Sequence, residues 1–249
     1  MGTLYVVGTP IGNLEDITLR ALRILREVAV IAAEDTRHAR VLLQHHEIRT
    51  ALTSFHDFTG TGKTRSLVQR IQAGEDVALI SDAGMPGISD PGYPLIQGAL
   101  AAGCEVTCVP GPSAILTALI LSGLPSHAFH YVGFLPRKPG ERRALLARLA
   151  EEEHTIVCFE SPHRLLRSLR DAEEAFGADR PVAVARELTK RFEEVLRITI
   201  AEAVTHFDSV APRGEFTLVL AGRGYRPERG AGEATMLPLL PPSIRIGRS

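Results

Sequence analysis

The sequence predicts an α/β fold made of two α/β domains, and three observations predict it. Short apolar stretches alternate with longer amphipathic stretches from residue 4 to residue 121, which is typical of a mostly parallel sheet covered by helices on both faces. A break rich in Gly and Pro at residues 123–126 ends this alternation, and a second set of strands follows it. The length of 249 residues is large for a single domain. We therefore expect domains at 1–122 and 123–222, followed by a flexible tail at 223–249.

In the first domain, the apolar stretches predict strands and the amphipathic stretches predict helices. Asp16 is the expected N-cap of the first helix, with Leu19, Leu22 and Leu25 on its buried face. The expected strands are 4–7, 28–33, 52–55, 77–80 and 105–109. The expected helices are 17–27, 36–46, 63–73, 95–102 and 113–121.

The second domain is expected to be more antiparallel. Ser161 as N-cap and Pro162 at the first helical position predict a helix from there to Phe176, and a second helix is expected at 141–152. The expected strands are 129–134, 155–159, 181–185, 195–200 and 216–220. The residues from 223 onward are rich in Gly, Pro and Arg without periodicity, which predicts the tail.

Composition bounds the class of protein. Net charge is −1, so contact with a polyanion would need a local basic patch. Cys104, Cys108 and Cys158 lie in apolar stretches, which predicts buried thiols in a reducing compartment. No basic amino-terminal region with a cleavage site is evident, and the longest apolar run, 114–121, is too short to cross a bilayer. We expect a cytoplasmic protein.

One loop is unusually rich in special residues. Ser81 to Pro94 contains three Gly, three Pro and two Asp directly after a buried strand. The carboxyl ends of strands are where open α/β folds bind ligands, and further loops at 8–14, 110–114 and 160–164 also follow strands. Loops of this kind have few bulky side chains and therefore expose backbone N–H and C=O groups. Such a surface suits a flat, mostly neutral ligand such as an adenosine-containing cofactor. The alternative is that they are only well-ordered turns.

For three other kinds of site, a phosphate-binding loop, a dinucleotide-binding motif and a metal site, the sequence lacks residues that the site requires. Gly60 to Thr64 resembles a phosphate-binding loop, but Asp57 stands where that motif requires Gly. No G-x-G-x-x-G follows any expected strand, which argues against a conventional Rossmann fold. His38, His45 and His46 lack converging Cys or carboxylate partners, so no metal is expected.

Eight segments in order carry a resemblance to a known family. They are Gly8 to Leu14, Ala33 to Arg37, Ser81 to Pro94, Pro110 to Ala114, Gly133 to Pro136, Glu160 to Leu165, Ala185 to Lys190 and Gly214 to Phe216. Together they closely resemble the tetrapyrrole methylase family, and within it the branch of ribosomal RNA small subunit methyltransferases I. The resemblance implies S-adenosylmethionine bound in a cleft between two α/β domains, methyl transfer to a ribose 2′-hydroxyl of a cytidine in 16S rRNA or the small ribosomal subunit, and a homodimer.

The resemblance also implies roles for individual residues. The cofactor contacts that it implies are Pro10, Asp82, Gly84, Met85, Ser113, Ala114, Phe159, Leu188, Gly214, Phe216 and Thr217. By residue type, the candidates for deprotonating the hydroxyl or stabilising its charge are Glu34, Glu160, Arg186 and Lys190, with Glu187 beside them. The basic residues expected to contact RNA are Arg37, Arg137, Lys138, Arg164 and Arg191.

Several alternatives remain open at this point. Asp82 could merely cap its turn, and Glu160 could merely interact with the helix that follows it. The loop at 56–60 departs from the His-x-His-Asn-Glu pattern of close relatives, and the tail replaces their helical extension. The rival functions are methylation of a tetrapyrrole precursor or a modified histidine, and a non-catalytic RNA-binding assembly factor.

Overall fold

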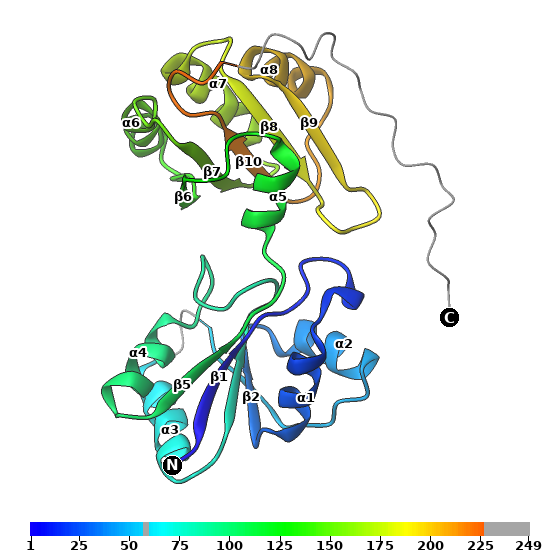
Figure 1. Ribbon diagram of the computed structural model, residues 1–249, viewed down its shortest axis with the longest axis vertical. Coiled ribbons are helices and arrows are strands. Elements are labelled where there is room, and N and C mark those ends of the chain that lie inside the picture. Colours follow the sequence, from blue (N-terminus) through cyan, green and yellow to red (C-terminus); the bar gives the residue numbers. More distant parts are fainter. Residues whose placement is uncertain (57–59, 227–249) are drawn as a thin grey trace.

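Two sheets, formed one after the other along the chain, organise the computed structural model, which describes residues 1–56 and 60–226 (Figure 1). Each sheet has five strands and its own helices. The prediction of two α/β domains is therefore confirmed. The expected tail falls mostly on residues 227–249, and the altered loop includes residues 57–59, so these two expectations lie largely outside the described residues.

The first sheet is entirely parallel, as predicted. Its strands are β1 (Thr3–Val7), β2 (Val30–Ala33), β3 (Leu52–Ser54), β4 (Val77–Ile80) and β5 (Glu105–Val109), in the order β3-β2-β4-β1-β5. Every residue of β2 and β4 is buried, because helices cover both faces of the sheet. All five strands end at the edge of the sheet that faces the second domain (Figure 1).

Four helices complete the first domain: α1 (Leu19–Glu27), α2 (Thr36–His45), α3 (Thr61–Gln72) and α4 (Tyr93–Ala101). The expected start of α1 was wrong. Its N-cap is Thr18, whose hydroxyl accepts the Ala21 amide, whereas Asp16 belongs to a short 3-10 turn, η1 (Leu14–Asp16). This start turns Leu19 outward and buries Ile24 instead.

The second sheet is mostly antiparallel, again as predicted. Its strands are β6 (Phe129–Phe134), β7 (Thr155–Glu160), β8 (Pro181–Arg186), β9 (Glu194–Thr199) and β10 (Phe216–Leu220), in the order β6-β7-β10-β8-β9. β6 and β7 run parallel, and the other neighbours run antiparallel.

Helices α6 (Pro139–Leu149), α7 (Leu165–Phe176) and α8 (Ile200–Ser209) pack on one face of this sheet. Helix α8 was not predicted from the sequence, although Thr199 and Glu202 form a capping box at its start. The start of α7 also differs, because Ser161 to Arg164 form a turn and the helix begins at Leu165.

Helix α5 (Ala114–Ser122) covers the opposite face of the second sheet. Its Ala118 and Leu119 are buried against Val157 and Val219, although the sequence division assigned this helix to the first domain. The packing favours a division at residues 110–113, where the chain passes from β5 into α5 (Figure 1). The exact domain boundary stays a prediction.

The cysteines are only partly where the sequence placed them. Cys104 and Cys158 are buried free thiols, but Cys108 is exposed, because β5 is an edge strand and this residue faces outward. Among the described helices, none is both long and apolar enough to cross a membrane.

Candidate active site

A cavity of about 630 Å³ lies between the two sheets. Its size is within the range of about 300–1,000 Å³ that is usual for small-molecule sites. Both domains line it: Ile11, Ala83, Gly84, Met85, Ile88, Ser89, Asp90, Ser113, Ala114, Ile115, Leu116, Phe129, Tyr131, Phe134, Phe159, Glu160, Ser161, Pro162, Leu188, Glu215, Phe216 and Thr217. The structure thus brings together Gly84, Met85, Ser113, Ala114, Phe159, Glu160, Leu188, Phe216 and Thr217, all of which were predicted site residues.

The floor of the cavity is made of tightly packed backbone from the loops after β1, β4 and β5. Thr9 and Gly84 exchange two backbone hydrogen bonds of 2.9 and 3.1 Å. Gly8 lies against Gly111, so that a Cβ on Gly8 would be 2.8 Å from the Gly111 Cα and 2.7 Å from the Met85 Sδ. Glycine is needed at these contacts because no side chain fits between the loops.

The opposite wall of the cavity is apolar and aromatic. Thr217 of β10 pairs with Phe159 of β7, and the Phe159 ring contacts the rings of Tyr131 and Phe134 at centroid distances of 5.4 and 5.3 Å. Such a wall suits the face of a purine or the apolar part of a cofactor. The aromatic residues of β6 were not predicted as site residues, although their density in residues 129–134 was a visible signal.

A hydrogen bond between Ser89 and Tyr131 joins the two domains across the cavity. The Ser89 hydroxyl lies 2.6 Å from the Tyr131 hydroxyl. Ser89 has a φ of 60°, a left-handed conformation that costs free energy for a residue other than glycine. Burial raises the pKa of Tyr131, so this phenol stays protonated and can donate. Neither Ser89 nor Tyr131 was predicted as a site residue.

Glu160 is fully buried at the end of β7, and its carboxylate is surrounded by donors. Arg164 Nη2 lies 2.6 Å from Oε1, the Ser161 amide donates to Oε1 at 2.6 Å, and the Ser168 hydroxyl donates to Oε2. The Arg164 guanidinium also donates to the Leu135 carbonyl at 3.0 Å. This geometry supports the role of holding the 160–164 turn rather than taking a proton, and the catalytic role stays an untested prediction.

Three other predicted residues do not line the cavity. Lys190 pairs with Glu187 at 3.0 Å and with Glu215 at 2.8 Å, and Arg186 pairs with Glu194 at 3.3 Å. Gly214 has a φ of +87°, and a Cβ there would be 2.6 Å from Glu187 Oε1. These residues support the 187–193 loop, which approaches the first domain where a Cβ on Gly12 would be 2.4 Å from Lys190 Cγ.

The charge of Glu187 is stabilised inside this network. Burial opposes ionisation of its carboxyl, but the hydrogen bonds from the Glu215 amide and from Lys190 outweigh burial and lower its pKa. A carboxylate whose pKa is lowered by such hydrogen bonds is a weaker base, so it is less suited to take a proton from a substrate. This geometry supports a structural role for Glu187, and its catalytic role stays a prediction.

Asp82 and Pro10 were expected in the cofactor site, but they line a separate, smaller pocket of about 230 Å³. The other residues around this pocket are Thr9, Leu14, His38, Val41 and Leu42. Asp82 lines this pocket rather than the large cavity, and its carboxylate accepts the Asp35 amide at 3.0 Å and contacts His38 Nδ1 at 2.9 Å. Glu34 is close by, since its Oε2 accepts the Asp82 amide at 3.4 Å.

The residues expected to contact RNA differ in availability. Arg137 and Lys138 are exposed on the loop before α6, and the Arg191 guanidinium lies 5.6 Å from the centroid of the exposed Phe192 ring. Arg37 is exposed but pairs with its neighbour Asp35. Arg164 is held by Glu160, so contact with RNA would require this buried pair to break.

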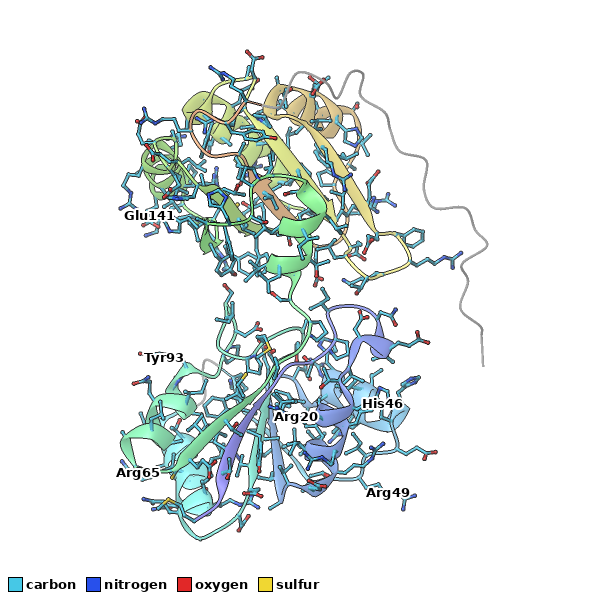
Figure 2. All side chains as sticks on the ribbon, in the orientation of Figure 1. Arg20, His46, Arg49, Arg65, Tyr93 and Glu141 are labelled. Carbon is cyan, nitrogen blue, oxygen red and sulfur yellow. The ribbon has the colours of Figure 1, made fainter. Side chains whose placement is uncertain are left out.

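Two further basic residues lie on the outer sides of the first domain. Figure 2 labels Arg49 and Arg65, both exposed, which project outward from the sides of the first domain, away from the second domain. Among residues 1–56 and 60–226, no group of three or more His, Cys, Asp or Glu side chains is arranged so that it could hold a metal ion.

Comparison with known proteins identifies the family of this arrangement. The family model of the tetrapyrrole (corrin/porphyrin) methylases matches residues 3–204. A Synechocystis protein named ribosomal RNA small subunit methyltransferase I is 50% identical over 89% of this chain and 80% of its own length. A Thermotoga maritima protein of the same name is 50% identical over 90% of this chain and 100% of its own length.

Solved structures share the fold. The methyltransferase CobJ superposes with a TM-score of 0.69, at 20% identity, over 91% of this chain and 97% of that one. Uroporphyrin-III C-methyltransferase from Thermus thermophilus, in complex with S-adenosylhomocysteine, superposes with a TM-score of 0.61, at 21% identity, over 88% of this chain and 97% of that one.

Proposed function

Because the chain belongs to the tetrapyrrole methylase family, we propose that it transfers a methyl group from S-adenosylmethionine to a ribose 2′-hydroxyl of a cytidine in 16S rRNA. The observation that carries the proposal is the cavity of about 630 Å³ between the two sheets, in a chain about half of whose residues match those of relatives named for rRNA methylation. The cofactor supplies an activated methyl group, so the chain itself must bind, orient and exclude water.

The residues around the cavity suit this cofactor. At the floor of the cavity, where Gly8 and Gly111 let the loops pack closely, backbone N–H and C=O groups are available. Ser113, at the N-cap of α5, provides a hydroxyl beside the cavity. The aromatic wall offers apolar surface around Phe159. We expect the residues at the floor to hold the polar parts of the cofactor and those at the wall to hold its flat or apolar parts.

The acceptor would be held through local basic residues rather than through net charge. The exposed Arg137, Lys138 and Arg191 are suitable phosphate contacts, and an exposed ring, Phe192, lies beside Arg191. Binding through phosphates releases counterions, so affinity for rRNA should fall steeply with salt. The acceptor could be free 16S rRNA or the small ribosomal subunit.

Two measurements test the proposal. Calorimetric titration should show binding of S-adenosylmethionine, and ribose-methylation mapping should show one 16S cytidine methylated only when the gene is present. An unchanged map would exclude the rRNA assignment and leave methylation of a tetrapyrrole precursor as the alternative. A chain that does not bind the cofactor would instead be a non-catalytic RNA-binding protein.

Filling the cavity should abolish cofactor binding. We expect Ala114→Phe to weaken binding of S-adenosylmethionine by at least about 100-fold, since the ring would occupy space lined by Ala114 that the ligand needs. The control is Ala101→Phe, at an exposed position at the end of α4, which should bind as the unaltered chain does. Calorimetry gives both affinities, and equal affinities would place the cofactor elsewhere.

A homodimer in the cytoplasm completes the proposal. Helix α5 is apolar on all sides, and its Leu116 and Ile120 remain exposed, as does Phe129. Exposed apolar residues that gather in this way are typical of an interface. We expect light scattering to give twice the chain mass for the unaltered protein and the single chain mass for Ile120→Glu. A monomer without the substitution would contradict the dimer.

A further inference from the structure

The small pocket beside the cavity combines an apolar surface with two ionisable groups. Leu14 and Leu42 with Pro10 provide the apolar part, and His38 and Asp82 provide the ionisable groups. Its volume of about 230 Å³ is below the range of about 300–1,000 Å³ that is usual for small-molecule sites, so it suits one unit of a larger ligand rather than a whole cofactor.

His38 and Asp82 form an ordered pair. His38 Nδ1 lies 2.9 Å from Asp82 Oδ2, while Oδ1 of the same carboxylate accepts the Asp35 amide at 3.0 Å. The carboxylate is thereby fixed at both oxygens and favours the imidazole tautomer that carries its proton on Nδ1. Nε2 is then the acceptor, on a side chain that is 69% exposed.

The pocket and the large cavity adjoin each other at one pair of loops, in which Thr9 and Gly84 exchange backbone hydrogen bonds. Asp82 lines the small pocket, whereas Ala83 and Gly84, the next two residues, line the large cavity. One turn, residues 82–84, therefore contributes both to the small pocket and to the cavity in which we expect the methyl donor.

We propose that the small pocket receives the acceptor nucleoside and that His38 Nε2 accepts the proton of its 2′-hydroxyl, with Asp82 as the residue that positions His38. The assignment rests on the proposed function. As the O–H bond breaks, the oxygen forms a bond to the methyl carbon, the carbon–sulfur bond breaks, and its electron pair stays on sulfur. His38 then releases the proton to water.

The charges around His38 determine how the reaction should depend on pH. The hydrogen bond that His38 donates to the Asp82 carboxylate, together with the charge of that carboxylate, raises the pKa of His38 above the ordinary value. Asp35 adds to this, and burial and Arg37 oppose it. Glu34 contributes a further carboxyl near the Asp82 amide. A base must be neutral to act, so methyl transfer should rise with pH through the pKa of His38 and then level off.

The test uses single-turnover methyl transfer to the 16S acceptor across pH, with calorimetry of S-adenosylmethionine. We expect His38→Gln to lower the plateau rate by about 100-fold or more, because a positioned base contributes roughly 10²–10⁴-fold. Asp82→Asn should lower the plateau less and move the rise to lower pH. Cofactor affinity should stay within about twofold in both variants, since neither residue lines the large cavity.

His45→Gln is the matched control, because His45 is exposed on the same helix and lies outside the pocket. It should transfer methyl groups at the rate of the unaltered chain. NMR titration of the protein without ligands gives a second readout: the pKa of His38 should be above its ordinary value and should fall in Asp82→Asn but not in His45→Gln.

Each result decides the assignment. If His38→Gln reacts at a rate within about threefold of the unaltered chain, His38 is not the base. If Asp82→Asn loses cofactor affinity, Asp82 belongs to the cofactor site, as first expected from the sequence, and the assignment of the pocket is overturned. If the unaltered chain binds the cofactor but methylates no 16S cytidine, the proposed function itself fails, and the assignment fails with it.

Discussion

Replacing Arg164 with methionine is expected to lower the free energy of unfolding by about 3–5 kcal/mol. The reason is that Glu160 is fully buried, and Arg164 is the cation that lies 2.6 Å from its carboxylate. Methionine keeps the length of the side chain but removes the charge, which leaves a carboxylate desolvated beside only neutral donors, Ser161 and Ser168. Chemical denaturation followed by circular dichroism measures the loss.

The matched control is Arg167→Met, one turn further along α7, where the side chain is exposed. Exposed substitutions of this kind usually change stability by less than about 0.5 kcal/mol. A loss in Arg164→Met no larger than in the control would mean that the pair contributes nothing. The double variant Arg164→Met with Glu160→Gln should recover part of the loss, because the unpaired charge is then gone.

Replacing Gly8 with alanine is the second large effect that we expect. A methyl group there would be 2.8 Å from the Gly111 Cα and 2.7 Å from the Met85 Sδ, so the loop after β5 would have to move. Inserting a methyl group into a closely packed site costs about 1–3 kcal/mol. Because these loops form the floor of the cavity, binding of S-adenosylmethionine should weaken by at least about tenfold in the same variant.

Gly62→Ala provides the comparison, because no atom lies within 4 Å of a Cβ at this position in α3. Alanine should be neutral or slightly stabilising in that helix. Thermal unfolding and calorimetry on both variants separate a local clash from the general effect of losing a glycine. Full stability and full cofactor affinity in Gly8→Ala would contradict the close packing of the floor.

Much of the fold could be predicted from the sequence because strand signals are local. The wholly apolar stretches at β2 and β4 predict strands buried on both faces, which is how they lie. The start of α1 was misjudged because Asp16 and Thr18 are both good N-caps and only the packing of Ile24 decides between them. Helix α8 was missed although its capping box was present, because it follows β9 without a loop and its first residue, Ile200, continues the apolar pattern of the expected strand 195–200.

The candidate site was predicted less completely, for a different reason. Loops after parallel strands must meet at one edge, so the floor around Gly84 and Met85 could be expected. Which way a loop residue faces depends on partners far along the chain. Asp82 lines the small pocket because Asp35 and His38 hold its carboxylate there, and Tyr131 reaches the cavity because β6 pairs beside β7.

The order of the second sheet has a consequence for synthesis of the chain. All strands of the first sheet are complete at residue 109, whereas β10, the last strand in sequence, occupies the middle of the second sheet between β7 and β8. On a translating ribosome, the strands of the first sheet can pair early. The second sheet stays incomplete until residue 220 has emerged, because β10 is the strand that pairs with both β7 and β8. The nascent protein should therefore have no complete cavity until nearly all of the described chain has been made.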